Sequence, residues 1–196
     1  MVRANINYAA RTGFRQRYYA NDHARDTVVI DAQPMEIANG RALETVLDAE
    51  GFRLVSHASA VADFTDKAQV AAIHGAEIVA LLIEQTGADA VFCTSPGILR
   101  FSEKSKQAGA LDNSMPARFA HIDITDGTAQ GFARGGPHDG RAFKRFAHYN
   151  VWRSFSGAPQ DVPLAVCDAR SVDQANDFLV EDAIFDPPGG APEWGF

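Results

Sequence analysis

The longest helical pattern in the chain covers residues 67–87, KAQVAAIHGAEIVALLIEQTG. Its apolar residues recur at helical spacing: Val70, Ile73, Ile78, Leu81 and Leu82. This spacing places them on one face of a helix. Asp63, Thr65 or Asp66 can cap its first turn, and Gly87 can end it in the left-handed conformation that glycine adopts easily. The segment predicts a long amphipathic helix followed by a buried strand at residues 88–94.

Short segments rich in apolar or alternating side chains predict further strands. They lie at residues 27–32, 52–59, 116–125, 143–155 and 163–169. Shorter helices are predicted at 40–52 and at 171–182, the second capped by Ser171, and irregular loops at 95–115 and 125–143. Because strands separated by turn-rich loops dominate after residue 88, the pattern favours an α+β chain with a β-sandwich or barrel and outer helices. A doubly wound sheet is disfavoured.

The length of 196 residues predicts a single domain, 1–196, with a helix-rich portion at about 1–88 and a β-rich core at about 88–196. The net charge of −7 disfavours nonspecific binding to nucleic acid or to anionic membranes. No apolar segment is long enough to span a bilayer, and the first residues lack the apolar part of a signal peptide. Cys93 and Cys167 end apolar runs and are predicted to be buried thiols in a reducing, cytoplasmic compartment.

The stretch ARFAHIDIT, residues 117–125, contains the most informative pair of polar side chains. Since neighbouring side chains alternate between the faces of a strand, His121 and Asp123 would share one face. An imidazole nitrogen and a carboxylate oxygen at this spacing can reach one ion, as in the first part of the 2-His-1-carboxylate triad of non-haem Fe(II) oxygenases. The alternative is a half-exposed strand with two polar residues facing solvent.

A third ligand would normally be a histidine further along the chain, and only His138 and His148 follow Asp123. His138 lies in a glycine-rich loop, which is a poor place to fix a ligand. His148 lies on a predicted strand and could face the same cavity, although a cross-strand hydrogen bond is the more frequent role. Either His148 completes the site or the third ligand is absent from this chain.

Several polar or aromatic residues further along have two interpretations each. Arg153 can grip a carboxylate with its planar fork, or it can pair with Asp161 or Asp168 at a strand end. Asp168 either forms a turn with Ser171 or supports the site from behind its ligands. Nucleophilic, nucleotide-binding and zinc-binding motifs are absent, so no catalytic residue is assigned beyond the metal site.

The ordered motifs H-I-D, YNVWR and PLAVCDARSV resemble the family of the cephamycin 7α-methoxylase small subunit, the AsaB-like hydroxylase/desaturases and a fungal endoperoxide-forming oxygenase. The resemblance runs from about residue 5 to the end and includes NYAARTG and ALETVLDAEGF. It implies a double-stranded β-helix (jelly-roll) core with flanking N-terminal helices. It also implies Fe(II) as the metal, with 2-oxoglutarate and dioxygen as cosubstrates.

The resemblance assigns roles to individual residues. His121 and Asp123 match the family's iron ligands. Asn150, Trp152 and Arg153 match the family's strand that lies on the side of the cosubstrate. Asp168, Arg170 and Ser171 match the family's C-D-A-R-S segment. At the position of His148 relatives carry an aliphatic residue, and the family's distal histidine is expected beyond Phe196, so the chain is expected to be incomplete at the C-terminus.

The leading prediction is an Fe(II)/2-oxoglutarate-dependent hydroxylase or desaturase of a small secondary metabolite. The alternative from another class is a noncatalytic jelly-roll binding or partner subunit, or an inactive fragment of such an enzyme. A methyltransferase ranks third, because no glycine-rich S-adenosylmethionine loop is present. The sequence leaves open the identity of the substrate and whether the chain forms a homo-oligomer or pairs with a partner subunit.

Overall fold

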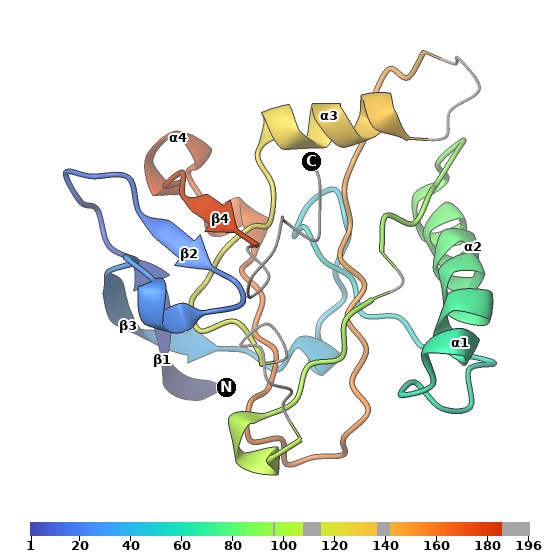
Figure 1. Cartoon of the computed structure of the whole chain (residues 1–196), viewed down its shortest axis with the longest axis horizontal. Coiled ribbons are helices and arrows are strands. Elements are labelled where there is room, and N and C mark those ends of the chain that lie inside the picture. The colour runs from blue at the N-terminus through green and yellow to red at the C-terminus, as the bar shows by residue number, and fades with distance from the viewer. Residues whose placement is uncertain (96, 108–114, 137–141, 186–196) are drawn as a thin grey trace. The chain divides into compact units, whose positions relative to one another are not determined.

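The computed structural model describes residues 1–95, 97–107, 115–136 and 142–185. Figure 1 draws these residues in colour, and they divide into two compact units. The first unit contains residues 1–54, 100–121 and those after 160, and the second contains residues 55–99 and 122–160.

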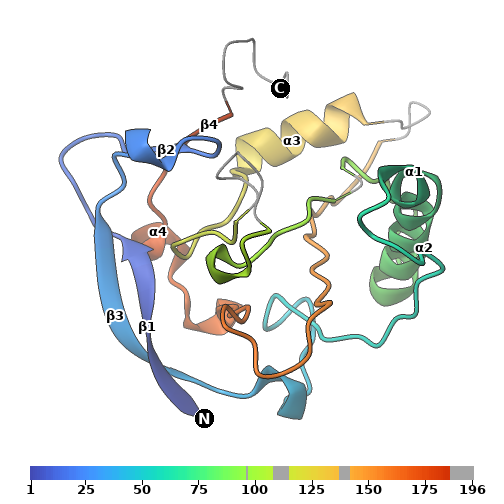
Figure 2. The same cartoon turned by 60° about the horizontal axis from the view of Figure 1, so that its bottom comes forward.

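The first unit is built around an antiparallel ribbon of β1 (Val2–Ala9) and β3 (Ile30–Ile37), which run side by side in Figures 1 and 2. The register pairs Val2 with Ile37 and Ala9 with Ile30. The strand predicted at residues 27–32 overlaps the start of β3. The first four residues of β1 and the first seven of β3 are exposed, apolar side chains such as Val2 and Ile30 included.

A buried glutamine extends this ribbon beyond its last backbone pair. Gln16 is only 4% exposed. Its Nε2 donates to the carbonyl oxygen of Ala10 at 2.7 Å, and its Oε1 accepts from the backbone N–H of Val29 at 2.6 Å. Both ends of the amide are therefore satisfied, which removes the free-energy cost of burying it.

The first unit has a second, smaller sheet, in which β2 (Arg17–Tyr19) pairs in parallel with β4 (Asp182–Ile184). Arg15, just before β2, forms a salt bridge to Asp182 at 2.8 Å. Among its described residues, this unit also contains α4 (Gln174–Asp177) and the 3-10 helices His23–Arg25, Gly40–Ala42, Glu103–Ser105 and Ala169–Ser171.

Glu50 and Arg170 join two distant segments of the first unit. The Glu50 carboxylate is buried, accepts from the N–H of Val46 at 2.7 Å and pairs with Arg170 at 2.8 Å. The guanidinium also grips Asp168, at 2.6 Å between Nη2 and Oδ2, and this hydrogen bonding lowers the pKa of Asp168. Next to this network, the N–H of Ala169 donates to the carbonyl oxygen of Glu50 at 2.9 Å.

The second unit contains the long helix predicted from the apolar pattern. It runs through α1 (Lys67–Gln69), a π-helical turn (Val70–His74) and α2 (Gly75–Thr86). Asp66 is the residue that caps it, accepting from the N–H groups of Ala68 and Gln69. Gly87 ends it with φ +66°, which confirms the predicted stop.

The loop predicted at residues 125–143 is wrong in its first half, where the chain forms α3 (Asp126–Gly135). Thr125 caps this helix, its side-chain oxygen accepting from the N–H of Thr128 at 3.3 Å. The glycines of the segment lower its helix propensity and made it resemble a loop. This cap is the local signal that indicates the helix.

Other predicted elements are not formed. No strand is assigned in the described parts of residues 52–59, 88–94, 116–125, 143–155 and 163–169. The helix predicted at 40–52 shrinks to the 3-10 turn Gly40–Ala42, and Asp173 rather than Ser171 caps the short α4. The jelly-roll core remains a prediction, since the described strands form two separate two-stranded sheets.

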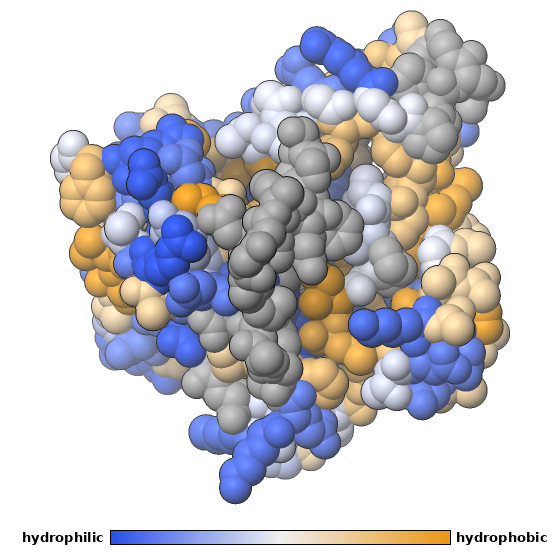
Figure 3. Space-filling model, viewed as in Figure 1, coloured by the Kyte–Doolittle hydropathy of each residue, from blue (hydrophilic) through white to orange (hydrophobic). Residues whose placement is uncertain are grey.

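Both cysteines are free and exposed, so the prediction of buried thiols is wrong. The reason is that neither residue lies on a strand that another strand covers. Large apolar side chains also reach the surface, including Trp152 at 51% and Phe155 at 58% exposed, and Figure 3 shows apolar atoms in several places on one face. Within the described ranges, no helix is both long enough and apolar enough to cross a membrane.

Replacing Gly51 with alanine should destabilise the first unit. Gly51 has φ +83°, and an added Cβ would lie 3.2 Å from the Cβ of Ala169. We expect Gly51→Ala to lower the free energy of unfolding by about 1 to 2 kcal/mol, measured by urea denaturation. Gly40→Ala is the matched control, because a Cβ there meets nothing within 4 Å. Equal stability of the two variants would contradict the strained geometry at Gly51.

The acid sensitivity of the second unit should depend on Glu77. Its carboxylate accepts from the Ser59 hydroxyl at 2.5 Å and from the N–H of Ala60 at 2.6 Å, and these hydrogen bonds lower its pKa. A lowered pKa stabilises the fold above the unfolded-state pKa, and this contribution disappears as the pH falls through the folded-state pKa. Glu77→Gln should therefore lose less stability than the wild type from about pH 6 to about pH 3. Glu84→Gln, on an exposed part of the same helix, should retain the wild-type profile.

Candidate functional site

Asn7 of β1 positions the backbone that leads to His121 in the first unit. The N–H of Ala120 donates to the carbonyl oxygen of Asn7 at 2.8 Å, and Nδ2 of Asn7 donates to the carbonyl oxygen of Arg118 at 2.8 Å. The side chain and the backbone of one residue thus hold both sides of Phe119. These two hydrogen bonds, called the Asn7 clamp below, fix the backbone directly before His121. Strand pairing does not hold this segment.

One ring nitrogen of His121 forms a hydrogen bond to the backbone two residues earlier in the chain. Nδ1 lies 2.9 Å from the carbonyl oxygen of Phe119. A carbonyl oxygen can only accept, so Nδ1 carries a hydrogen, and in the neutral ring the lone pair is on Nε2. Metal-binding histidines commonly donate their other ring N–H to a backbone carbonyl in this way. The Phe119 ring packs edge-on against Tyr18, with 5.6 Å between centroids, and supports this arrangement.

An acidic residue that the sequence analysis did not single out interacts with His121. Burial raises the pKa of Glu181, and the charge of His121 lowers it. Oε1 of Glu181 is buried and has no hydrogen-bond partner among the described residues. The carboxyl group is therefore part of the electrostatic environment of His121 within the first unit.

Asp123 belongs to the second unit, because the boundary between the units falls directly after His121. Within that unit, Nδ2 of Asn150 donates a hydrogen bond to Oδ2 of Asp123. This contact brings together two residues that lie 27 positions apart and that the resemblance assigns to the metal and to the cosubstrate. Both side chains are exposed, so solutes can reach them.

The other two predicted cosubstrate residues lie in different surroundings. Trp152 is half exposed. Arg153 is half-buried and donates to His57, through Nη1 to the carbonyl oxygen at 3.0 Å and through Nη2 to Nδ1 at 2.7 Å. The alternative partners also have other contacts: Asp161 accepts from the Ser102 hydroxyl, and Asp168 pairs with Arg170.

No third metal ligand is found in the part of the chain that the structure describes. Within it, no group of three or more His, Cys, Asp or Glu side chains could hold a metal ion. The ring of His148 stacks on Phe132 of α3, with 6.0 Å between centroids. His138 lies outside the described residues. Imidazole and carboxylate groups are donor types that iron accepts, and the assignment of His121 and Asp123 as its ligands remains a prediction.

The C-D-A-R-S segment has a structural role. The Asp168 side chain accepts from the N–H of Arg170 at 3.0 Å and begins the 3-10 helix Ala169–Ser171. The Ser171 hydroxyl donates to the carbonyl oxygen of Asp168 at 2.7 Å. The turn-forming interpretation of Asp168 is therefore confirmed. Its carboxylate also pairs with Arg170.

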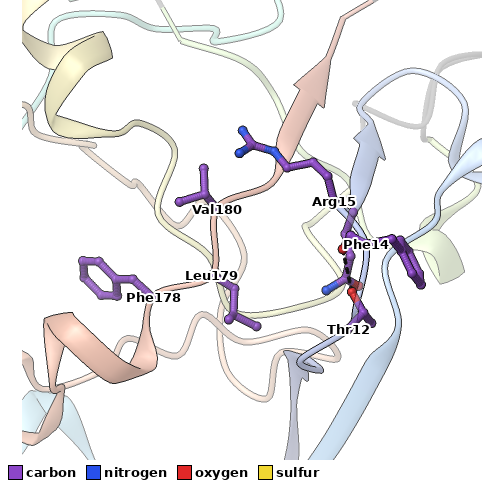
Figure 4. Close-up of a pocket in the computed structure, with 7 residues that line it drawn as sticks. Thr12, Phe14, Arg15, Phe178, Leu179 and Val180 are labelled. Carbon is purple, nitrogen blue, oxygen red and sulfur yellow. Dashed lines mark hydrogen bonds between the residues drawn. The ribbon is translucent and has the colours of Figure 1, made fainter.

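Two shallow cavities lie in the first unit, and neither contains a predicted site residue. One, of about 270 Å³, is lined by Thr12, Phe14, Arg15, Gln16, Phe178, Leu179 and Val180 (Figure 4). The other, of about 300 Å³, is lined by Asn7, Pro116, Ala117, Arg118 and Val162. The second cavity borders the Asn7 clamp, so it lies along the chain segment that leads to His121.

The sequence alone assigned no role to Asn7 and Glu181 of the first unit or to His57 of the second. Asn7 is part of the NYAARTG motif, so the resemblance contained a signal for it. No local pattern marks His57 as the partner of Arg153, because the two residues are 96 positions apart. The same is true of Glu181 and His121, whose interaction depends on the tertiary fold.

Comparison with known proteins gives two matches. The family model described as "Oxidoreductase/YMDC permease-like domain" matches residues 6–191. The alpha-ketoglutarate-dependent dioxygenase phiK from Fungal sp. (strain ATCC 74256) is 27% identical over 169 residues, which cover 84% of this chain. The chain spans 60% of the length of that relative. No solved structure matches the chain.

The Asn150–Asp123 contact predicts a measurable effect on metal affinity. Partners that orient metal ligands typically change affinity by about 10- to 100-fold when they are removed. We expect Asn150→Leu to weaken Fe(II) binding about tenfold, measured by anaerobic calorimetry. Asn176→Leu is the matched control, since it removes a similar amide donor from Asp173 at 2.7 Å in α4. Unchanged affinity in Asn150→Leu would exclude a role for this hydrogen bond in metal binding.

Proposed function

The chain belongs to the oxidoreductase/YMDC permease-like domain family, and we propose that within it the chain is an Fe(II)/2-oxoglutarate-dependent oxygenase. We propose further that it hydroxylates or desaturates a small secondary metabolite, as the AsaB-like hydroxylase/desaturases do. A jelly-roll core is part of the same proposal. The name of the 27% identical relative, an alpha-ketoglutarate-dependent dioxygenase, supports the cosubstrate.

The observation that carries the proposal is the hydrogen bond from Asn150 to Asp123. The sequence resemblance assigns Asp123 to the metal and Asn150 to the cosubstrate side. The motifs that carry it contain no information on whether these two residues touch. Their direct contact in the second unit is what a shared site requires. The Nδ1 hydrogen bond of His121 supports the same interpretation, because it leaves the lone pair on the nitrogen that would bind the metal.

Within this proposal, each residue has a defined task. His121 and Asp123 would supply two ligands to iron, which when bound provides the two-electron oxidation of substrate at the expense of dioxygen and 2-oxoglutarate. Asn150 orients the carboxylate of Asp123. Arg153 would hold a carboxylate of 2-oxoglutarate through its guanidinium. The exposed ring of Trp152 offers an apolar surface beside it.

The test is spectroscopic and uses the purified chain under anaerobic conditions. Fe(II) together with 2-oxoglutarate should produce the weak visible charge-transfer band of the chelated complex. The band should be lost in His121→Ala and in Asp123→Ala and retained in His23→Ala, which removes an imidazole elsewhere. A band that persists in His121→Ala would overturn the assignment of the ligands.

The alternative, a noncatalytic binding or partner subunit, predicts a different outcome. In that case the wild-type chain would give no band at any concentration of Fe(II) and 2-oxoglutarate, and no succinate would form in air. Formation of succinate that requires Fe(II) and His121 would exclude the noncatalytic role.

A further inference from the structure

The surroundings of Arg153 form a compact cluster within the second unit. Two of its nitrogens donate to His57, at 3.0 Å to the carbonyl oxygen and at 2.7 Å to Nδ1. Its Cζ lies 5.7 Å from the centroid of the Phe64 ring, which in turn contacts Phe155 with 4.6 Å between centroids. One side of the guanidinium therefore faces His57, and the aromatic pair lies nearby.

The contact with Arg153 determines the hydrogen position on His57. A guanidinium has five N–H donors and no acceptor. Since Nη2 approaches Nδ1 at 2.7 Å, Nδ1 must be the acceptor, and the ring hydrogen is on Nε2. His57 is thus neutral in this arrangement.

The segment that carries His57 is itself anchored to the long helix. Glu77 of α2 accepts from the Ser59 hydroxyl at 2.5 Å and from the N–H of Ala60 at 2.6 Å. These bonds hold residues that follow His57 by two and three positions. The backbone next to His57 is consequently held by α2, and His57 in turn positions Arg153 through its two hydrogen bonds.

The third nitrogen of the Arg153 guanidinium, Nε, is in a different situation from the two Nη atoms. Nε is buried and makes no hydrogen bond within the described residues. A buried donor without an acceptor is costly, and an acceptor supplied by a ligand would relieve that cost. Because each Nη group donates one hydrogen bond to His57, the orientation of the guanidinium, and with it the direction of the Nε–H bond, is set before any ligand arrives.

We propose that His57, as the neutral Nε2–H tautomer, is a positioning residue that holds Arg153 so that its Nε–H bond is directed at a ligand carboxylate. The inference rests on the proposed function, in which that ligand is 2-oxoglutarate. A guanidinium held in advance loses less side-chain entropy on binding, so His57 contributes to affinity without touching the ligand.

The test compares side chains at position 57 that differ in their ability to accept a hydrogen bond. His57→Phe keeps a ring and removes the acceptor, whereas Oδ1 of His57→Asn can take the place of Nδ1. Affinity for 2-oxoglutarate is measured by calorimetry on the Fe(II)-loaded chain without oxygen. We expect His57→Phe to bind about tenfold more weakly than the wild type, and His57→Asn to recover most of the affinity.

Two controls separate the possible outcomes. His23→Phe makes the same replacement beside Asp26 in the first unit and should bind as the wild type does. The double variant His57→Phe/Arg153→Met should be no weaker than Arg153→Met alone, because His57 acts only through Arg153. Circular dichroism establishes that each variant is folded. If His57→Phe does not fold, His57→Ala replaces it with the same expected loss.

Failure of the inference differs from failure of the proposed function. If the wild-type chain does not bind 2-oxoglutarate, the proposed function fails. If the wild type binds and His57→Phe or His57→Ala binds equally well, the positioning role is overturned while the function stands. If His57→Asn is as weak as His57→Phe, the acceptor at Nδ1 is not what matters, and the inference is likewise overturned.

Discussion

The clamp that Asn7 makes on residues 118–120 is the contact on which the candidate site of the first unit depends. A polar residue of the N-terminal strand uses both its backbone and its side chain to hold a segment more than a hundred positions away. His121 follows directly, and its ring is oriented by the carbonyl of Phe119. The N-terminal NYAARTG motif therefore has a physical role in placing His121, the residue proposed as a metal ligand.

The sequence predicts what depends on local interactions and misses what depends on distant ones. The helix ending at Gly87 is predictable because its cap, its apolar face and its stop all lie within about twenty residues. The alternation in residues 143–155 does not produce a strand, because a strand needs a partner that no local pattern supplies. At the site, the H-x-D spacing suggests His121 and Asp123, whereas the His57 contact with Arg153 depends entirely on tertiary structure.

Two of the residues proposed to lie near the cosubstrate, Asn150 and Arg153, make different kinds of contact. Asn150 contacts Asp123, a candidate ligand, and Arg153 contacts His57, a support anchored to α2. Residues three positions apart on one short segment thus connect a candidate metal ligand with the long helix. In an oxygenase this arrangement would let the same segment align both the metal and the carboxylate of the cosubstrate.

The π-helical turn at Val70–His74 has a consequence for the geometry of the long helix. A turn closed by i→i+5 hydrogen bonds holds one more residue than an α-helical turn, so it shifts the angular phase of everything that follows. The faces of α1 and α2 are therefore not continuous on a single helical wheel. Removing one residue from this turn would restore an unbroken wheel, but it would rotate His74 and Glu77 by about 100° relative to α1. The extra residue thus sets the angle at which the helix presents Glu77 to Ser59 and Ala60.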